Sequence, residues 1–162
     1  MNDIHLPSFK RRNKAAPVAN VEVPKPDSPT VDVLIVGAGF AGLGTAIRLQ
    51  QAGIRDVVLL ERGAEVGGTW RDNQYPGAAC DIPSNLYSYS FAQNPQWSRG
   101  FSGSREILGY IHQLVDRFDL AGRVRFNQNV TGMVFDEAAG QWAVHTAGGQ
   151  THRARSVVMA QG

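Results

Sequence analysis

The chain holds a single cysteine, Cys80, among its 162 residues. One thiol excludes an internal disulfide framework and fits a reducing compartment. The sequence also lacks any apolar run near the roughly 18 residues that a membrane-spanning helix requires. Its N-terminus lacks the apolar stretch of a secretion signal. We therefore expect a soluble protein of the cytoplasm with no membrane span.

The excess of positive over negative charge is also small, because the net charge is only +2. So small an excess does not argue for nucleic acid as a partner. Residues 1–30 hold five of the eight prolines and show no sustained periodicity, so we interpret them as a disordered leader. The four histidines show no metal-ligand spacing, which predicts no metal site.

Glycine, in contrast, is abundant, with 18 of 162 residues, or roughly 11% against a usual level of about 7%. Such an excess indicates tight turns or a backbone that approaches a ligand closely. The length suits one domain with a real core. We expect that domain to span residues 31–162.

The domain opens with a β-strand, a glycine turn, an α-helix and a second strand. The run VDVLIV at residues 31–36 is apolar and β-branched, as in a strand buried on both faces. A helical pattern follows and closes near Gly53, and the run VVLLE at residues 57–61 predicts the next parallel strand. This order within about 30 residues is a βαβ unit.

The turn GAGFAG places Gly37, Gly39 and Gly42 at the spacing of a dinucleotide-binding loop. The glycines allow the tight turn, the approach of a pyrophosphate and close packing of helix on strand. Glu61 follows Gly42 by 19 residues, where a carboxylate binds ribose hydroxyls and disfavours a 2′-phosphate. The first site therefore suits FAD or NAD; the alternative is a plain glycine turn with Glu61 on the surface.

The second half predicts one helix and several short strands. Residues 104–120 carry apolar side chains on one helical face, with Ser104 as a candidate N-cap and Gly122 as a stop. Turns at EAAGQ and AGGQ then suggest a small antiparallel β-meander. The run from Val157 to Ala160 predicts a strand that returns to the parallel sheet. The fold class is α/β, with a Rossmann-like dinucleotide-binding domain.

Two further motifs point to one family. ERGAEVGGTW resembles the extended FAD-binding pattern of glutathione-reductase-like flavoproteins. GGTWRDNQYPGAACDIPSNLYSYSF resembles the flavin-dependent Baeyer–Villiger monooxygenases, within the flavin-containing monooxygenases. The likeness runs from about Val31 to Gly162 and implies an FAD-binding domain that lacks the NADP domain. It covers roughly the first third of such proteins, so we expect a fragment or a truncated gene product.

The resemblance implies a set of cofactor contacts. The pyrophosphate would lie on Gly37, Ala38, Gly39, Phe40, Ala41 and Gly42. The adenosine half would meet Glu61, Arg62 and the backbone of Val130. The flavin side would be lined by Gly68, Thr69, Trp70, Arg71, Asp72 and Tyr87. Ala79, Cys80 and Asp81 would border NADP(H) where it stacks on the flavin. At Arg71 and Asp72 the family commonly has an aromatic pair instead.

Asp81 is the candidate catalytic residue. The resemblance implies a place near the isoalloxazine, with an arginine partner supplied by chain beyond residue 162. The alternative is an aspartate that caps a loop turn. Cys80 has no second cysteine nearby, so we interpret it as a buried structural thiol.

For the intact protein the resemblance implies an FAD- and NADPH-dependent monooxygenase. NADPH would reduce the flavin, O₂ would add at its C4a position, and the peroxyflavin would convert a ketone into an ester or lactone. Two alternatives stay open: an N- or S-oxygenating flavin monooxygenase, and a truncated, non-catalytic nucleotide-binding module. We expect no complete catalytic cycle from these 162 residues alone.

Overall fold

A computed structural model describes residues 29–162, so the predicted leader lies almost wholly outside the described part. The first elements are β1 (Val31–Val36), α1 (Phe40–Gln51), β2 (Val57–Leu60) and the single turn α2 (Thr69–Asp72). After the short 3₁₀ turn Ser84–Leu86 comes α3 (Ser104–Arg117), then a second 3₁₀ turn, Ala121–Arg123. The last strands are β3 (Val124–Arg125), β4 (Val130–Asp136), β5 (Gln141–Thr146) and β6 (Thr151–Met159).

The strands form one six-stranded sheet in the order β3-β2-β1-β6-β5-β4. β1 lies between β2 and β6 and pairs with both in parallel, while β4, β5 and β6 form an antiparallel meander. β1 and β2 begin in register, with Val33 opposite Val57. The βαβ unit and the meander are therefore confirmed.

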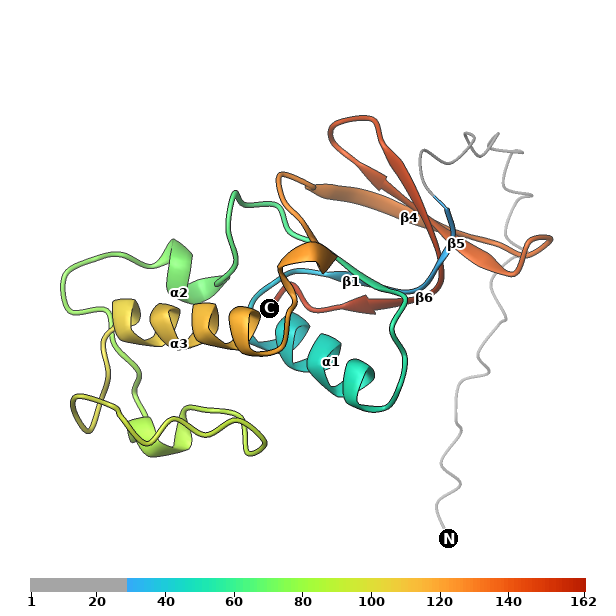
Figure 1. The fold of residues 1–162 in the computed structure, drawn as a ribbon. Helices are drawn as coiled ribbons and strands as arrows, with labels where there is room; N and C mark the ends of the chain where they lie inside the picture. Colours follow the sequence, from blue (N-terminus) through green and yellow to red (C-terminus); the bar gives the residue numbers. More distant parts are fainter. Residues whose placement is uncertain (1–28) are drawn as a thin grey trace, which may run out of the picture.

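β6 pairs with both the meander and the parallel strands, although the sequence predicts a separate strand for each pairing. Its first half pairs antiparallel with β5, with His152 opposite Val144, and its second half pairs parallel with β1, with Val157 opposite Leu34. The predicted run from Val157 to Ala160 is therefore no strand of its own. It is the end of a nine-residue strand that joins the meander to the parallel sheet (Figure 1).

The two faces of the parallel strands are buried against different layers. α1 and α3 cover one face through Leu43, Ile47 and Ile111, which pack with Ile35 and Leu59. On the other face Leu34, Val36 and Leu60 pack with Val144 and Ala154 of the meander. Burial on both sides explains why the first strand reads as a continuous apolar run. Figure 1 shows α1 and α3 on the side of the sheet away from β4 and β5.

The boundaries of α3 differ from the prediction at both ends. Gly103 is the N-cap, without a side-chain capping bond, and Ser104 is already helical. The helix ends at Arg117 rather than at residue 120, because Asp119 takes the left-handed conformation at φ 51°. This reversal turns Leu120 back into the core, where it is fully buried. The apolar periodicity continues past the helix end, which is why the sequence overestimates its length.

The long irregular stretch before α3 is tied down by backbone hydrogen bonds. Cys80 N–H donates to the Ser102 carbonyl at 3.0 Å, and Ser104 N–H donates to the Ala78 carbonyl at 2.8 Å. The buried hydroxyl of Ser84 accepts the Ser102 N–H at 2.8 Å. Within residues 29–162, no helix has both the length and the apolar character needed to cross a bilayer.

Candidate functional site

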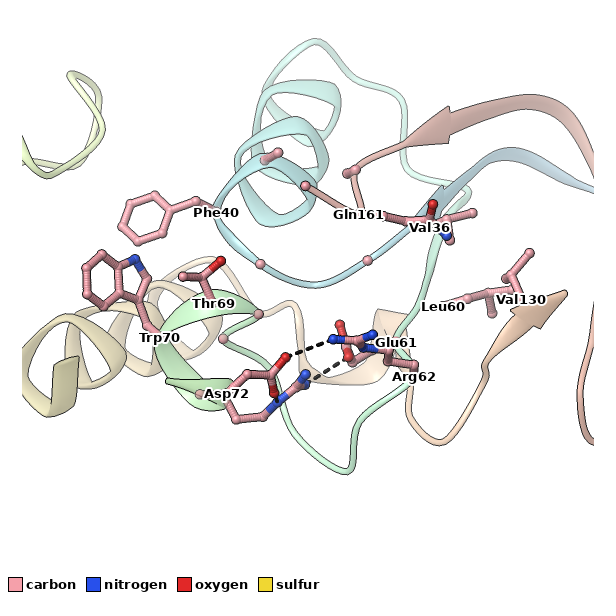
Figure 2. Close-up of a pocket in the computed structure, with 18 of the residues that line it drawn as sticks. Val36, Phe40, Leu60, Glu61, Arg62, Thr69, Trp70, Asp72, Val130 and Gln161 are labelled. Atoms are coloured by element: carbon pink, nitrogen blue, oxygen red, sulfur yellow. Dashed lines mark hydrogen bonds and ion pairs between the residues drawn. The ribbon is translucent and has the colours of Figure 1, made fainter. Parts of the chain in front are cut away.

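A cleft of about 630 Å³ opens where β1 and β2 end and α1 begins. This is the edge at which open α/β sheets bind their ligands, and the volume falls in the range of small-molecule sites. In Figure 2, Phe40 and Trp70 lie towards one end of the cleft and Leu60 and Val130 towards the other, with Glu61 between them. The predicted cofactor residues that line it are Gly37, Gly39, Phe40, Ala41, Glu61, Arg62, Gly68, Thr69, Trp70, Arg71, Asp72, Tyr87 and Val130.

The glycine turn permits the close packing that shapes this edge. Gly37 has φ +106°, and a Cβ there would lie 2.6 Å from the Ala160 carbonyl oxygen. α1 starts beyond it with Gly39 as an N-cap that makes no side-chain capping bond. The first N–H groups of a helix have no intrahelical partner. Gly39, Phe40 and Ala41 line the cleft, so this end of α1 presents an anion site.

A second pair of glycines packs against the first turn. Gly67 N–H donates to the Ala38 carbonyl at 3.0 Å. A Cβ on Gly68 would lie 3.2 Å from the Cα of Gly39, so the two backbones face each other without side chains. Ala38 and Gly42 lie behind this surface and do not line the cleft; Ala38 is fully buried. The result is a narrow floor of bare backbone beside the helix N-terminus.

Glu61 is a buried carboxylate with three hydrogen-bond donors. It is 3% exposed. Its Oε2 accepts the Ala38 N–H at 2.8 Å, and its Oε1 accepts the Gly63 N–H at 2.8 Å and Arg71 Nη1 at 2.8 Å. Burial raises the pKa of Glu61, but these donors outweigh burial and hold that pKa below its ordinary value. The carboxylate is therefore ionised and fixed at the cleft wall.

Arg71 connects the short helix α2 to the end of β2. The resemblance implies a flavin-side position for this residue, whereas its guanidinium reaches Glu61 and, through Nε, Asp72 Oδ1 at 2.8 Å. Asp72 also accepts Arg62 Nη2 at 3.0 Å. The hydrogen bond from Arg71 to Asp72 is the main cause that raises the pKa of Arg71. Two arginines and two carboxylates thus alternate along this wall, as the dashed lines in Figure 2 show in part.

Aromatic side chains close the other end of the cleft. Trp70 Nε1 donates to the Tyr87 hydroxyl at 3.0 Å, and the two rings meet edge-to-face with centroids 5.2 Å apart. Phe40 packs edge-on against Tyr87 at 5.3 Å. Burial raises the pKa of Tyr87 above its ordinary value, so its phenol stays protonated at neutral pH. This end of the cleft suits a flat aromatic group.

Besides Ala38 and Gly42, three of the predicted residues do not line the cleft. Ala79 and Asp81 are exposed, and Cys80 is buried with its Sγ 3.9 Å from the Ser84 hydroxyl. The burial of Cys80 agrees with a structural thiol. Within residues 29–162 the Asp81 carboxylate makes no hydrogen bond or ion pair. The arginine partner that the resemblance implies would come from sequence beyond residue 162.

The cleft also contains residues outside the predicted set of cofactor contacts. The polar ones are Asn73, just after α2, Gln128 and Asn129, just before β4, and Gln161, just after β6. The others are Val36, Leu60, Gly67, Ala160 and Gly162. A signal for Gln128 and Asn129 existed: they follow β3, and parallel strands bring their carboxyl ends to one edge. At two residues, β3 is too short to be recognised as a strand from its sequence.

The features of the cleft together fit a pyrophosphate-bridged nucleotide. A helix N-terminus, bare glycine backbone and a buried carboxylate line one cleft, and these are the groups that suit phosphates and a ribose hydroxyl. Comparison with known proteins agrees. The family model of the NAD(P)-binding Rossmann-like domain matches residues 35–102. A Baeyer–Villiger monooxygenase of Streptomyces coelicolor is 50% identical over 132 residues, which are 82% of this chain and 25% of that protein.

The chain is related to the Baeyer–Villiger monooxygenases. Another relative, the FAD-binding monooxygenase moxY of Dothistroma septosporum, is 42% identical over 74% of this chain and 19% of its own length. The crystal structure of cyclohexanone monooxygenase from Rhodococcus sp. Phi1 bound to NADP+ superposes with a TM-score of 0.78 at 38% identity. It matches 83% of this chain and 26% of that protein. The resemblance and the Rossmann-like fold are thus confirmed, and the chain spans about a quarter of the Baeyer–Villiger monooxygenases it matches.

Proposed function

We propose that this chain is the FAD-binding part of an NADPH- and O₂-dependent monooxygenase that oxygenates ketones to esters or lactones. The observation that carries the proposal is the cleft itself. An aromatic end, the N-terminus of α1 and the buried carboxylate of Glu61 line one groove. A dinucleotide with a flat ring at one end has that same order of chemical groups.

Different residues of the cleft would bind different parts of the cofactor. The N-terminus of α1 would hold the pyrophosphate, and Glu61 would accept a hydroxyl of the adenosine ribose. Trp70, Tyr87 and Phe40 would border the isoalloxazine. When bound, FAD would supply the redox chemistry, passing electrons from NADPH to O₂ and an oxygen atom to the substrate. Asp81, exposed in this chain, would need an arginine partner from further sequence to act beside the flavin.

The names of the relatives support the wider assignment. One relative is FAD-binding by name, and the cyclohexanone monooxygenase structure holds NADP+. We extend both cofactors, and a ketone substrate, to the protein to which this chain belongs. A small molecule, and no nucleic acid, is the proposed partner, since the net charge is only +2. The single, buried cysteine suits our assignment of the protein to the cytoplasm.

Flavin retention tests the proposal. The chain is purified, mixed with FAD and passed through gel filtration, and flavin absorbance is followed in the protein peak. We expect flavin to travel with the wild-type chain and to fall sharply with Glu61→Ala. A folded wild-type chain that emerges colourless contradicts the proposal. NADPH oxidation with cyclohexanone is measured alongside, and we expect none from these 162 residues alone.

A further inference from the structure

The carboxylate of Glu61 has few hydrogen-bond acceptor positions left for a ligand. Oε1 is occupied twice, by the Gly63 N–H and by Arg71 Nη1, both at 2.8 Å. Oε2 accepts only the Ala38 N–H, at 2.8 Å. An ionised carboxylate offers about two acceptor positions on each oxygen. One position on Oε2 is therefore left for a hydroxyl that enters from the cleft.

Arg71 determines which oxygen is left open. Its guanidinium is held by three acceptors: Glu61 Oε1 at 2.8 Å, Asp72 Oδ1 at 2.8 Å and the Glu65 carbonyl at 2.6 Å. Only 11% of the Arg71 side chain is exposed, and 4% of the Glu61 side chain. A planar guanidinium gripped at three points has a single orientation. The pair is buried enough that water does not replace either partner readily.

The backbone leaves room for this guanidinium at one residue. A Cβ at Gly63 would lie 2.2 Å from Arg71 Nη1 and 2.5 Å from its Cζ. Gly63 has an ordinary φ, so the chain conformation does not itself require a glycine there. A side chain at residue 63 would instead displace the guanidinium, which lies close to this backbone. Gly63 is thus part of the Arg71 site, and it lies within the ERGAEVGGTW run that resembles an FAD-binding pattern.

We propose that Arg71 is a positioning residue, which fixes the Glu61 carboxylate so that Oε2 meets a hydroxyl of the adenosine ribose. The inference rests on the proposed FAD site and deepens it. It assigns to the arginine after the GGTW motif a task at the adenosine end, although α2 also carries Trp70 at the flavin end. The same short helix would then couple the two ends of the cofactor site.

The test measures how much a single ribose hydroxyl contributes to binding affinity. Binding of ADP, 2′-deoxy-ADP and 3′-deoxy-ADP is measured by calorimetry for the wild-type chain and for Arg71→Gln. In the wild type we expect loss of the recognised hydroxyl to weaken binding by about tenfold or more. The deoxy penalty is the factor by which affinity falls when ADP is replaced by the analogue that lacks the recognised hydroxyl. In Arg71→Gln we expect weaker binding of ADP and a deoxy penalty reduced to about twofold, because Glu61 no longer holds one orientation.

Two further variants separate positioning from charge. Gly63→Ala keeps every charge and the N–H at residue 63 but displaces the guanidinium, so we expect it to lose the deoxy penalty as Arg71→Gln does. Arg71→Lys keeps a cation beside Glu61 but lacks the planar guanidinium, so we expect it to lose most of the penalty as well. Arg155→Gln is the matched control, since Arg155 is 75% exposed and pairs with Asp32 outside the cleft. We expect wild-type binding from it.

The outcomes distinguish this inference from the function on which it rests. If the wild-type chain binds FAD and ADP but Arg71→Gln and Gly63→Ala keep the full deoxy penalty, the positioning role is overturned and the FAD site stands. A wild-type chain that binds neither nucleotide overturns both. Circular dichroism and urea unfolding identify any variant that fails to fold. Arg71→Lys, the mildest change, then decides the case: a full penalty kept in folded Arg71→Lys would show that charge alone suffices and would contradict the positioning role of the guanidinium.

Discussion

A Cβ placed on Gly42 would lie 1.9 Å from the carbonyl oxygen of Gly37. The carbonyl belongs to the backbone, and the backbone fixes the position of a Cβ, so neither atom can rotate away. The third glycine of the motif therefore holds α1 against the end of β1, and through it the N–H groups that face the cleft. The requirement is one of packing, because φ at Gly42 is ordinary.

Gly42→Ala should accordingly destabilise the fold and abolish nucleotide binding. Overpacking against backbone costs about 1–3 kcal/mol or more of unfolding free energy, which urea unfolding measures. The matched control is Gly109→Ala in α3, where a Cβ meets nothing within 4 Å. The control should gain about 1 kcal/mol, since alanine is the better helix former. Equal stabilities of the two variants would argue against the tight turn.

The stability contributed by Glu61 should depend on pH in a defined direction. Burial raises the pKa of Glu61, but hydrogen bonds from Gly63, Arg71 and Ala38 leave that pKa lowered in the folded state. A carboxyl with a lowered folded pKa stabilises the fold at pH values above its unfolded pKa. That contribution is lost as the pH falls through the folded pKa.

Glu61→Gln should therefore lose stability at pH 7 and lose much less at an acidic pH below the folded pKa of Glu61. Removal of one partner of a buried ion pair costs about 3–5 kcal/mol. Urea unfolding of wild type and variant at both pH values gives the two differences. A difference that stays constant with pH would show that the Glu61 carboxylate is not held ionised by its neighbours.

The aromatic end of the cleft should be separable from the adenosine end. Tyr87→Phe removes the acceptor of the Trp70 indole N–H, which lies 3.0 Å from the hydroxyl. We expect a loss of about 1 kcal/mol in stability and weaker binding of FAD, with ADP binding unchanged. Fluorescence titration with each nucleotide measures this. Equal weakening of ADP would contradict the placement of Tyr87 beside the ring.

Substitution of Asp81 should change neither the stability of this chain nor its retention of FAD. Its side chain is exposed and makes no hydrogen bond or ion pair within residues 29–162. Asp81→Asn should therefore change the unfolding free energy by no more than about 0.5 kcal/mol and leave FAD retention as in wild type. A substantial loss of stability on urea unfolding would reveal a structural role as a loop cap, which was the alternative for this residue.

The sequence predicts the fold best where each residue obeys a local rule. The spacing of Gly37, Gly39 and Gly42 between an apolar run and an amphipathic one defines the βαβ unit, and Glu61 ends up at the cleft as predicted. These features depend on backbone geometry within about 30 residues. They need no knowledge of distant contacts.

The rest depends on contacts that are distant in sequence. Arg71 could pair with several carboxylates, and only the folded chain brings it to Glu61, ten residues earlier. β6 continues through polar residues because its two halves pair with different neighbours. α3 ends early because Asp119 reverses the chain, although Leu120 keeps the apolar periodicity. No local sequence pattern predicts this ion pair, the length of β6 or the end of α3.

Equilibrium titration of the chain with FAD and with FMN tests the central claim most directly. FMN lacks the adenosine that Glu61 would hold and one of the two phosphates that the N-terminus of α1 would meet. We predict that FAD binds at least about a hundredfold more tightly than FMN. Equal affinity for the two flavins, or no binding of FAD by the folded chain, would contradict the account.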